Sequence, residues 1–121
     1  MTCSTTIAGT PLAWANDSSY EQVFAEQLDN LVAGGDVVIA ISGSGTSPNV
    51  LRAVERAQER GAVTVGLTGF QGGHLRTLCS LCIVVPSEHM DQIENVHLAL
   101  QHLICVSLAQ LSSASMAVFH R

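Results

Sequence analysis

Six consecutive residues, Ser42-Gly43-Ser44-Gly45-Thr46-Ser47, have the side chains and the spacing of a phosphate-binding loop. Their four hydroxyls can donate hydrogen bonds to phosphate oxygens, and the two glycines let the backbone approach a ligand closely. Pro48 follows directly and suits the first turn of a helix, which places Ser47 at the N-cap. Free amides and the helix dipole favour an anion at such a position. A connecting loop with helix-cap chemistry would explain the same residues about equally well.

Two other phosphate-binding patterns do not fit this loop. A dinucleotide fingerprint requires a third glycine, whereas Gly43-Ser44-Gly45 is followed by Thr46-Ser47-Pro48. A nucleoside-triphosphate loop requires a lysine, and the chain contains none. Any phosphate must therefore be held by backbone amides, hydroxyls and the end of a helix.

Titratable side chains gather in an apolar stretch near the C-terminus that contains Glu94, His97 and His102. On a helix, Glu94 and His102 would be separated by a rise of about 12 Å and an angle of about 80°, so they share a broad face without contact. Glu94-x-x-His97 has the helical spacing of carboxylate–histidine metal sites, but such sites need a second copy from another helix. We therefore interpret His97 as a polar helix position.

The four cysteines are Cys3, Cys79, Cys82 and Cys105. Cys79 and Cys82 have CxxC spacing, but no second pair of cysteines or histidines completes a zinc set. The N-terminus shows no secretory signal, so reduced thiols and a cytoplasmic location are expected. We interpret the cysteines as small buried residues.

The elements that position the loop predict an α/β fold with a parallel sheet. The run Val37–Ile41 is apolar throughout, as in a strand covered on both faces. Ligands in such sheets bind beyond the carboxyl ends of the strands, where the serine loop would lie. The predicted strands lie near residues 5–8, 37–42, 62–67 and 81–85. A long helix over 91–112 is apolar on most of its circumference, which predicts burial, in part in a subunit contact, and 112–121 is predicted to be a frayed tail.

Composition excludes several classes of function. At 121 residues the chain is long enough for one domain, and 47% hydrophobic against 12% charged residues suggests apolar surface for subunit contacts. No apolar run is long enough to span a membrane. With a net charge of −5 and 4% aromatic residues, no basic or aromatic face for nucleic acid is expected.

These residues resemble the SIS (sugar isomerase) domain family and, within it, the phosphoheptose isomerase group. The serine loop with its flanks is characteristic of the superfamily, while an Asn-Asp pair and a histidine-containing last helix narrow the likeness to this group. The match extends from about Ile7 to Leu111 and is carried by the segments Trp14–Asp17, Gly35–Val50, Val65–Gly69 and Gln92–His102.

The resemblance implies a five-stranded parallel sheet of flavodoxin-like order and a homotetramer with sites between subunits, with a homodimer as the alternative. It also implies an aldose–ketose isomerase that interconverts sedoheptulose 7-phosphate and an aldoheptose 7-phosphate, on the route to lipopolysaccharide precursors. The family's substrate- and phosphate-binding positions correspond here to Ser42, Gly43, Ser44, Ser47, Asn16 and Asp17.

The resemblance also assigns the catalytic chemistry. His102 matches the family's catalytic histidine, which is described as a zinc ligand in some members. Glu94 stands where many members carry a glutamine that touches substrate and metal. The implied catalytic pair is therefore His102 and Glu94, and the same two residues are the implied zinc ligands.

One departure from the family concerns the N-terminal side. Family members carry an additional helix, strand, loop and helix there, the last with a histidine and the catalytic glutamate, and Met1–Ala15 does not replace them. The additional strand would lie in mid-sheet, between Thr5–Ala8 and Val37–Ile41. The chain is thus expected to correspond to the C-terminal two-thirds of a family member.

Three functional interpretations remain. The first is an isomerase, for which moving a proton between C1 and C2 needs both a base and an acid. His102 could serve as one and Glu94 is the nearest substitute for the other, so weak or no turnover is expected. The second is a non-catalytic, phosphosugar-binding regulatory SIS module, and the third is an inert fragment.

Overall fold

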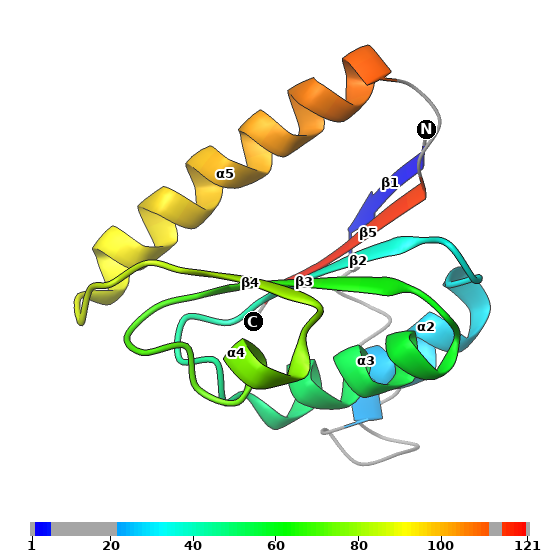
Figure 1. The fold of residues 1–121 in the computed structure, drawn as a ribbon, viewed down its shortest axis with the longest axis horizontal. Helices are drawn as coiled ribbons and strands as arrows, with labels where there is room; N and C mark the ends of the chain where they lie inside the picture. The colour runs from blue at the N-terminus through cyan, green and yellow to red at the C-terminus, as the bar shows by residue number, and fades with distance from the viewer. Residues whose placement is uncertain (1, 6–21, 112–114, 121) are drawn as a thin grey trace.

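The computed structural model describes residues 2–5, 22–111 and 115–120, which form an α/β fold (Figure 1). A parallel five-stranded sheet has the order β1-β5-β2-β3-β4. This confirms the predicted parallel α/β class. The strands are β1 (Thr2–Thr5), β2 (Val37–Ile41), β3 (Val63–Thr68), β4 (Leu81–Val84) and β5 (Ser115–His120), and the helices are α2 (Val23–Leu31), α3 (Pro48–Glu59), α4 (Leu75–Leu78) and α5 (Met90–Leu111).

The C-terminal strand β5 lies in the interior of the sheet, between β1 and β2. It pairs with β1 on one side and with β2 on the other, with Met116 opposite both Cys3 and Val37. The prediction of a frayed tail over 112–121 is therefore wrong for 115–120. The physical reason is that β1 and β2 each present a row of backbone groups to the space between them, and a strand there pairs both rows. The additional family strand was expected at this same position.

The other strands lie close to their predicted positions. β1 comes earlier than the predicted 5–8, and residues 6–8 lie outside the described part of the chain. The predicted helix 91–112 is confirmed to within one residue at each end by α5.

Among the described helices, α2, α3 and α4 lie on one face of the sheet and α5 alone lies on the other (Figure 1). Alternate residues of β2 point to opposite faces. Val38 and Ala40 belong to the core with α2 and α3, while Ile39 and Ile41 pack with Leu67 beneath α5. The loop after β2 is thereby fixed from both faces of the sheet.

Much of α5 is uncovered within the described chain. Only Ile93 and His97 of this helix are buried, so the prediction that its apolar circumference is buried is wrong for the single chain. One sheet face cannot cover a helix that is apolar all round. The exposed large apolar side chains of α5 are Met90, Val96, Leu98, Leu103, Val106 and Leu111. In the part of the chain that is described, no helix has both the length and the apolar character needed to cross a membrane.

Candidate functional site

The serine loop leaves β2 at the carboxyl edge of the sheet and ends at Ser47, the residue before α3. Its carbonyls are turned toward the neighbouring loop after β3. Gly69 N donates to Gly43 O at 2.8 Å, and Leu75 N donates to Gly45 O at 3.1 Å. In a trans peptide the N–H points opposite to the C=O. The Ser44 amide, which shares its peptide group with the Gly43 carbonyl, therefore points away from the neighbouring loop.

Backbone amides without an acceptor cluster at this loop. Two of its amides are used internally: Gly45 N donates to Ser42 Oγ at 3.1 Å, and Thr46 N donates to Ser44 Oγ at 3.2 Å. The described residues offer no acceptor to the amides of Gly43, Ser44, Ser47 and Asn49. Such unpaired donors at the start of a twelve-residue helix favour an anion.

The hydroxyls of the loop bond to one another. Ser42 Oγ lies 2.9 Å from Ser47 Oγ and 3.5 Å from Ser44 Oγ. Thr46 Oγ1 donates to Ser44 Oγ at 3.0 Å. Each of these bonds links two groups that can rotate about χ1, so an anion can replace them without a change of backbone. The hydroxyls therefore supply donors that are held near the free amides.

A cavity of about 580 Å³ opens beside the serine loop. This volume is typical of small-molecule sites. Ser42, Gly43, Ser44 and Ser47 line one side, and α5 lines the other. The lining residues from α5 are Met90, Glu94, Asn95, His97, Leu98 and Gln101.

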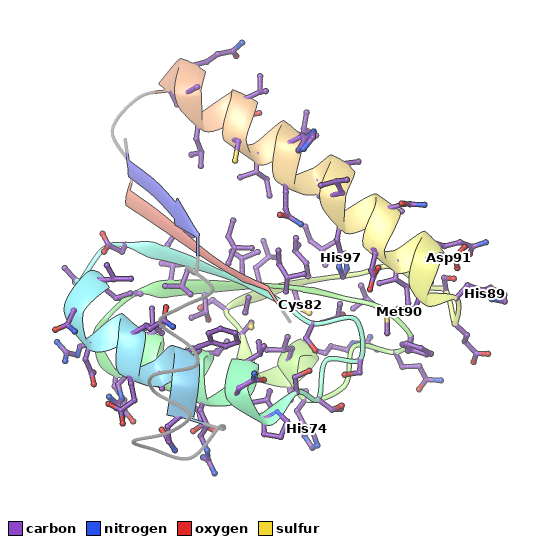
Figure 2. The ribbon with its side chains drawn as sticks, turned by 180° about the vertical axis from the view of Figure 1, so that it is seen from behind. His74, Cys82, His89, Met90, Asp91 and His97 are labelled. Carbon is purple, nitrogen blue, oxygen red and sulfur yellow. The ribbon has the colours of Figure 1, made fainter. Side chains whose placement is uncertain are left out.

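Close packing positions α5 over the loop (Figure 2). A Cβ atom on Gly69 would lie 2.6 Å from Ile93 Cγ1, and one on Gly43 would lie 2.5 Å from Met90 Sδ. One turn beyond Ile93, His97 is 3% exposed and its Nε2 lies 2.8 Å from Thr68 O. Glycines at the two loops thus allow the helix to approach, and a buried hydrogen bond fixes its position.

The structure brings together five of the predicted site residues: Ser42, Gly43, Ser44, Ser47 and Glu94 line the same cavity. His102 is exposed on α5 and is not among the residues that line it. Asn16 and Asp17 lie outside the described residues. The roles assigned to these positions remain predictions.

Sequence reasoning did not select His97, which was interpreted as a polar helix position and which lines the cavity as a buried residue. The i, i+3 spacing of Glu94 and His97 could have identified His97 as a site residue, because it places both side chains on one face of the helix. Which face meets the loop is decided by the contact between Ile93 and Gly69, and local spacing does not contain that information.

The residues expected to bind zinc do not form a complete site in the described chain. Within residues 22–111, no three His, Cys, Asp or Glu side chains are grouped closely enough to hold a metal ion. Glu94 lines the cavity whereas His102 does not. Zinc at this position would need ligands from outside the described residues, and we assign no chemical step to it.

The three cysteines with described side chains, Cys79, Cys82 and Cys105, are not among the residues that line the cavity. Cys79 is buried, Cys82 is half-buried and Cys105 is exposed, so the interpretation as buried residues is wrong for Cys105, which projects from the uncovered α5. Burial, helped by neighbouring Cys82, raises the pKa of the Cys79 thiol to about 11. A thiol with that pKa is almost entirely protonated near neutral pH and is a poor nucleophile or metal ligand.

Comparison with known proteins places this geometry in context. A family profile described as "SIS domain" matches residues 2–69. A phosphoheptose isomerase of Nitratiruptor sp. is 47% identical over 93 residues, which are 77% of this chain and 50% of that protein. A phosphoheptose isomerase of Rhodospirillum rubrum is 44% identical over 101 residues, or 84% of this chain and 54% of that protein.

Solved structures of phosphoheptose isomerases also align with this chain. The structure of a phosphoheptose isomerase from Francisella tularensis aligns with a TM-score of 0.79 at 31% identity, covering 84% of this chain and 55% of that one. One from Neisseria gonorrhoeae aligns with a TM-score of 0.81 at 32% identity, covering 87% and 59%. The chain spans about half the length of the curated relatives it matches.

Proposed function

The chain belongs to the SIS domain family, and from that premise we propose that it binds a phosphorylated sugar of the heptose 7-phosphate type in the cavity beside the serine loop. One observation carries the proposal. Four amides in the serine loop and the first turn of α3 have no acceptor among the described residues, and three of them, those of Gly43, Ser44 and Ser47, belong to residues that line a cavity of about 580 Å³. A neutral ligand would leave that group of donors without a charged partner.

The phosphate is held by local donors. The amides of the cavity-lining residues Gly43, Ser44 and Ser47 and the positive end of α3 would donate to it, and the serine hydroxyls would turn from one another to its oxygens. With no lysine in the chain and a net charge of −5, binding depends on these oriented dipoles. Affinity should therefore depend on salt less steeply than at a site built from several lysines.

The proposed activity is that of a phosphoheptose isomerase, which interconverts sedoheptulose 7-phosphate and an aldoheptose 7-phosphate on the route to lipopolysaccharide precursors. The relatives named above support this assignment. The reaction moves a proton between C1 and C2 and needs an acid and a base. Glu94 lines the cavity and His102 does not, so this chain assayed alone should show weak or no turnover.

A second candidate function follows from the same observation. Among the described residues, Glu94 and His97 are the only titratable side chains that line the cavity. A site with abundant phosphate donors and few acid–base groups suits a phosphosugar-binding regulatory module that performs no catalysis. Weak or no turnover by the chain alone is expected for both functions, so only robust turnover would separate them, and it would favour the isomerase.

Assembly is part of the proposal. The exposed apolar residues of α5, among them Leu103 at 63% and Val106 at 58% exposure, would be covered in a homo-oligomer. Leu103→Glu should shift the oligomer toward monomer in light scattering coupled to size exclusion. An unchanged mass would contradict this assignment of the surface. The free thiols of Cys79, Cys82 and Cys105 accord with the cytoplasmic location that we propose.

Isothermal titration tests the binding function. Sedoheptulose 7-phosphate should bind, and sedoheptulose without phosphate should bind far more weakly. Ser47→Ala should lower the affinity roughly tenfold, the effect of one charge-assisted hydrogen bond. Thr77→Ala, which removes an exposed hydroxyl on α4, should leave affinity unchanged. Equal binding of the two sugars would refute the assignment.

A further inference from the structure

His97 has a hydrogen-bonding arrangement that the phosphate site alone does not explain. The ring is 3% exposed, and its Nε2 lies 2.8 Å from Thr68 O. A carbonyl oxygen can only accept a hydrogen bond, so the proton of this contact is on Nε2. In the neutral ring the other nitrogen, Nδ1, then keeps its lone pair.

No described residue donates to that lone pair. Among the described residues, the side chain of His97 makes one hydrogen bond, from Nε2 to Thr68 O. The ring lines the same cavity as the serine loop. Thr68 O also accepts from Val85 N at 3.0 Å, so both of its lone pairs are in use. Thr68 O therefore fixes the imidazole and has no lone pair free for another donor. Nδ1 of this cavity-lining ring keeps an acceptor lone pair that no described residue uses.

The ring and the serine loop are joined through one peptide group. The carbonyl that holds His97 belongs to the peptide between Thr68 and Gly69. The N–H of the same peptide donates to Gly43 O at 2.8 Å. A peptide group is planar and stiff, and Ile93 packs against Gly69 from α5. The position of the histidine relative to the phosphate loop is thus fixed by a few stiff contacts.

The chemistry of the free nitrogen selects its partner. Ionised phosphate oxygens accept hydrogen bonds, so a lone pair on Nδ1 has little to gain from them. A sugar hydroxyl is a donor. We propose that Nδ1 of His97 accepts a hydrogen bond from a hydroxyl of the sugar chain while the serine loop holds the phosphate, which makes His97 a residue that recognises the sugar part of the ligand. The proposal rests on the proposed function and extends it.

Two substitutions separate this role from simple anchoring of α5. His97→Gln places an amide N–H near the position of Nε2, so it can keep the bond to Thr68 O and lose the acceptor at Nδ1. His97→Asn places an acceptor near Nδ1 and loses the reach to Thr68. His74→Gln, at an exposed histidine outside the cavity lining, is the matched control.

The experiment compares the affinities of sedoheptulose 7-phosphate and inorganic phosphate for the unsubstituted chain and these three variants. His97→Gln should weaken binding of the sugar phosphate roughly threefold to tenfold, the range of one neutral hydrogen bond, and leave inorganic phosphate unaffected. His97→Asn should lower the thermal stability yet keep the preference for the sugar phosphate. His74→Gln should change neither affinity.

The possible failures are distinguishable. If His97→Gln keeps the affinity ratio of the unsubstituted chain, His97 only anchors the helix and the present inference is overturned, while the proposed function stands. If the unsubstituted chain binds neither phosphate compound, the proposed function falls and this inference falls with it. Nitrogen-15 spectra give a second readout: the Nδ1 resonance of His97 should move with sedoheptulose 7-phosphate and stay in place with inorganic phosphate. The same shift with both compounds would also overturn the inference.

Discussion

Gly45→Ala should destabilise the chain more than its backbone conformation alone would predict. Gly45 has a φ of +70°, where a side chain costs about 1–2 kcal/mol. A Cβ atom there would also lie 2.6 Å from the carbonyl carbon of Gly72 and 3.1 Å from Gly73 N. These are backbone atoms of a loop that is itself tied down, because Leu75 N donates to Gly45 O at 3.1 Å. Overpacking of this kind costs about 1–3 kcal/mol more, for a total of about 2–5 kcal/mol.

Gly35→Ala is the matched control for this substitution. Gly35 has a φ of +88°, and a Cβ atom added there would meet nothing within 4 Å. It should therefore cost only the conformational part, about 1–2 kcal/mol. The loss of freedom in the unfolded chain is the same for both variants and cancels in their difference.

Urea unfolding followed by circular dichroism at 222 nm measures both variants, because helices contribute most of that signal. We expect Gly45→Ala to unfold at a lower urea midpoint than Gly35→Ala, with a similar slope. Sedoheptulose 7-phosphate should raise the midpoint of Gly35→Ala much more than that of Gly45→Ala. Equal midpoints would show that the close approach of the two loops does not contribute to stability. Normal ligand binding by Gly45→Ala would refute the claim that this approach shapes the site.

Two further predictions concern features outside the cavity. Asp29 receives two hydrogen bonds of 2.6 Å from Arg56, which hold the pKa of its carboxyl below the ordinary range. Asp29→Asn should therefore lower the free energy of unfolding by about 0.5–1 kcal/mol at pH 7. A lowered native pKa stabilises above the unfolded pKa, so this deficit should shrink below about pH 4 as the native carboxylate is protonated; a deficit that grows there would contradict the pairing. In a Cys3→Ser background, a thiol reagent at pH 8 should modify exposed Cys105 well before Cys79, whose pKa is raised to about 11; mass spectrometry showing the reverse order would contradict the burial of Cys79.

The serine loop and its flanks could be predicted because their signals are local. An unbroken apolar run gave β2 at Val37–Ile41, and Ser47 followed by Pro48 marked the start of α3. Strand, loop and helix follow one another directly along the chain. Their geometry at the edge of a parallel sheet is a general property of such units, so four residues of the cavity wall could be named in advance.

The strand β5 could not be predicted in the same way. Its residues Ser115–His120 follow a polar stretch, and their pairing depends on β1 and β2, which are distant in the sequence. A strand in mid-sheet is stabilised by the two rows of backbone groups that it satisfies. That requirement becomes visible only when the positions of all the other strands are known.

The part of the site contributed by α5 was only half predictable. Glu94 was selected from the family resemblance, while His97 was passed over. The apolar circumference of α5 predicted burial, yet Ile93 and His97 are its buried residues. Hydrophobic pattern tells which residues can be buried, whereas the number of elements available to cover them decides which are. The rotation of α5 over the loop is set by the packing of Ile93 on Gly69.

The most direct test of phosphate binding is a titration of the ¹⁵N-labelled chain with sedoheptulose 7-phosphate, followed by amide resonances. The amides of Gly43, Ser44, Ser47 and Asn49, which have no acceptor among the described residues, should shift downfield together and saturate at one ligand concentration. The Gly35 amide, which already donates to Gly61 O at 3.2 Å, should stay in place. If other amide resonances shift while these four do not, the assignment of the serine loop as the phosphate site is contradicted.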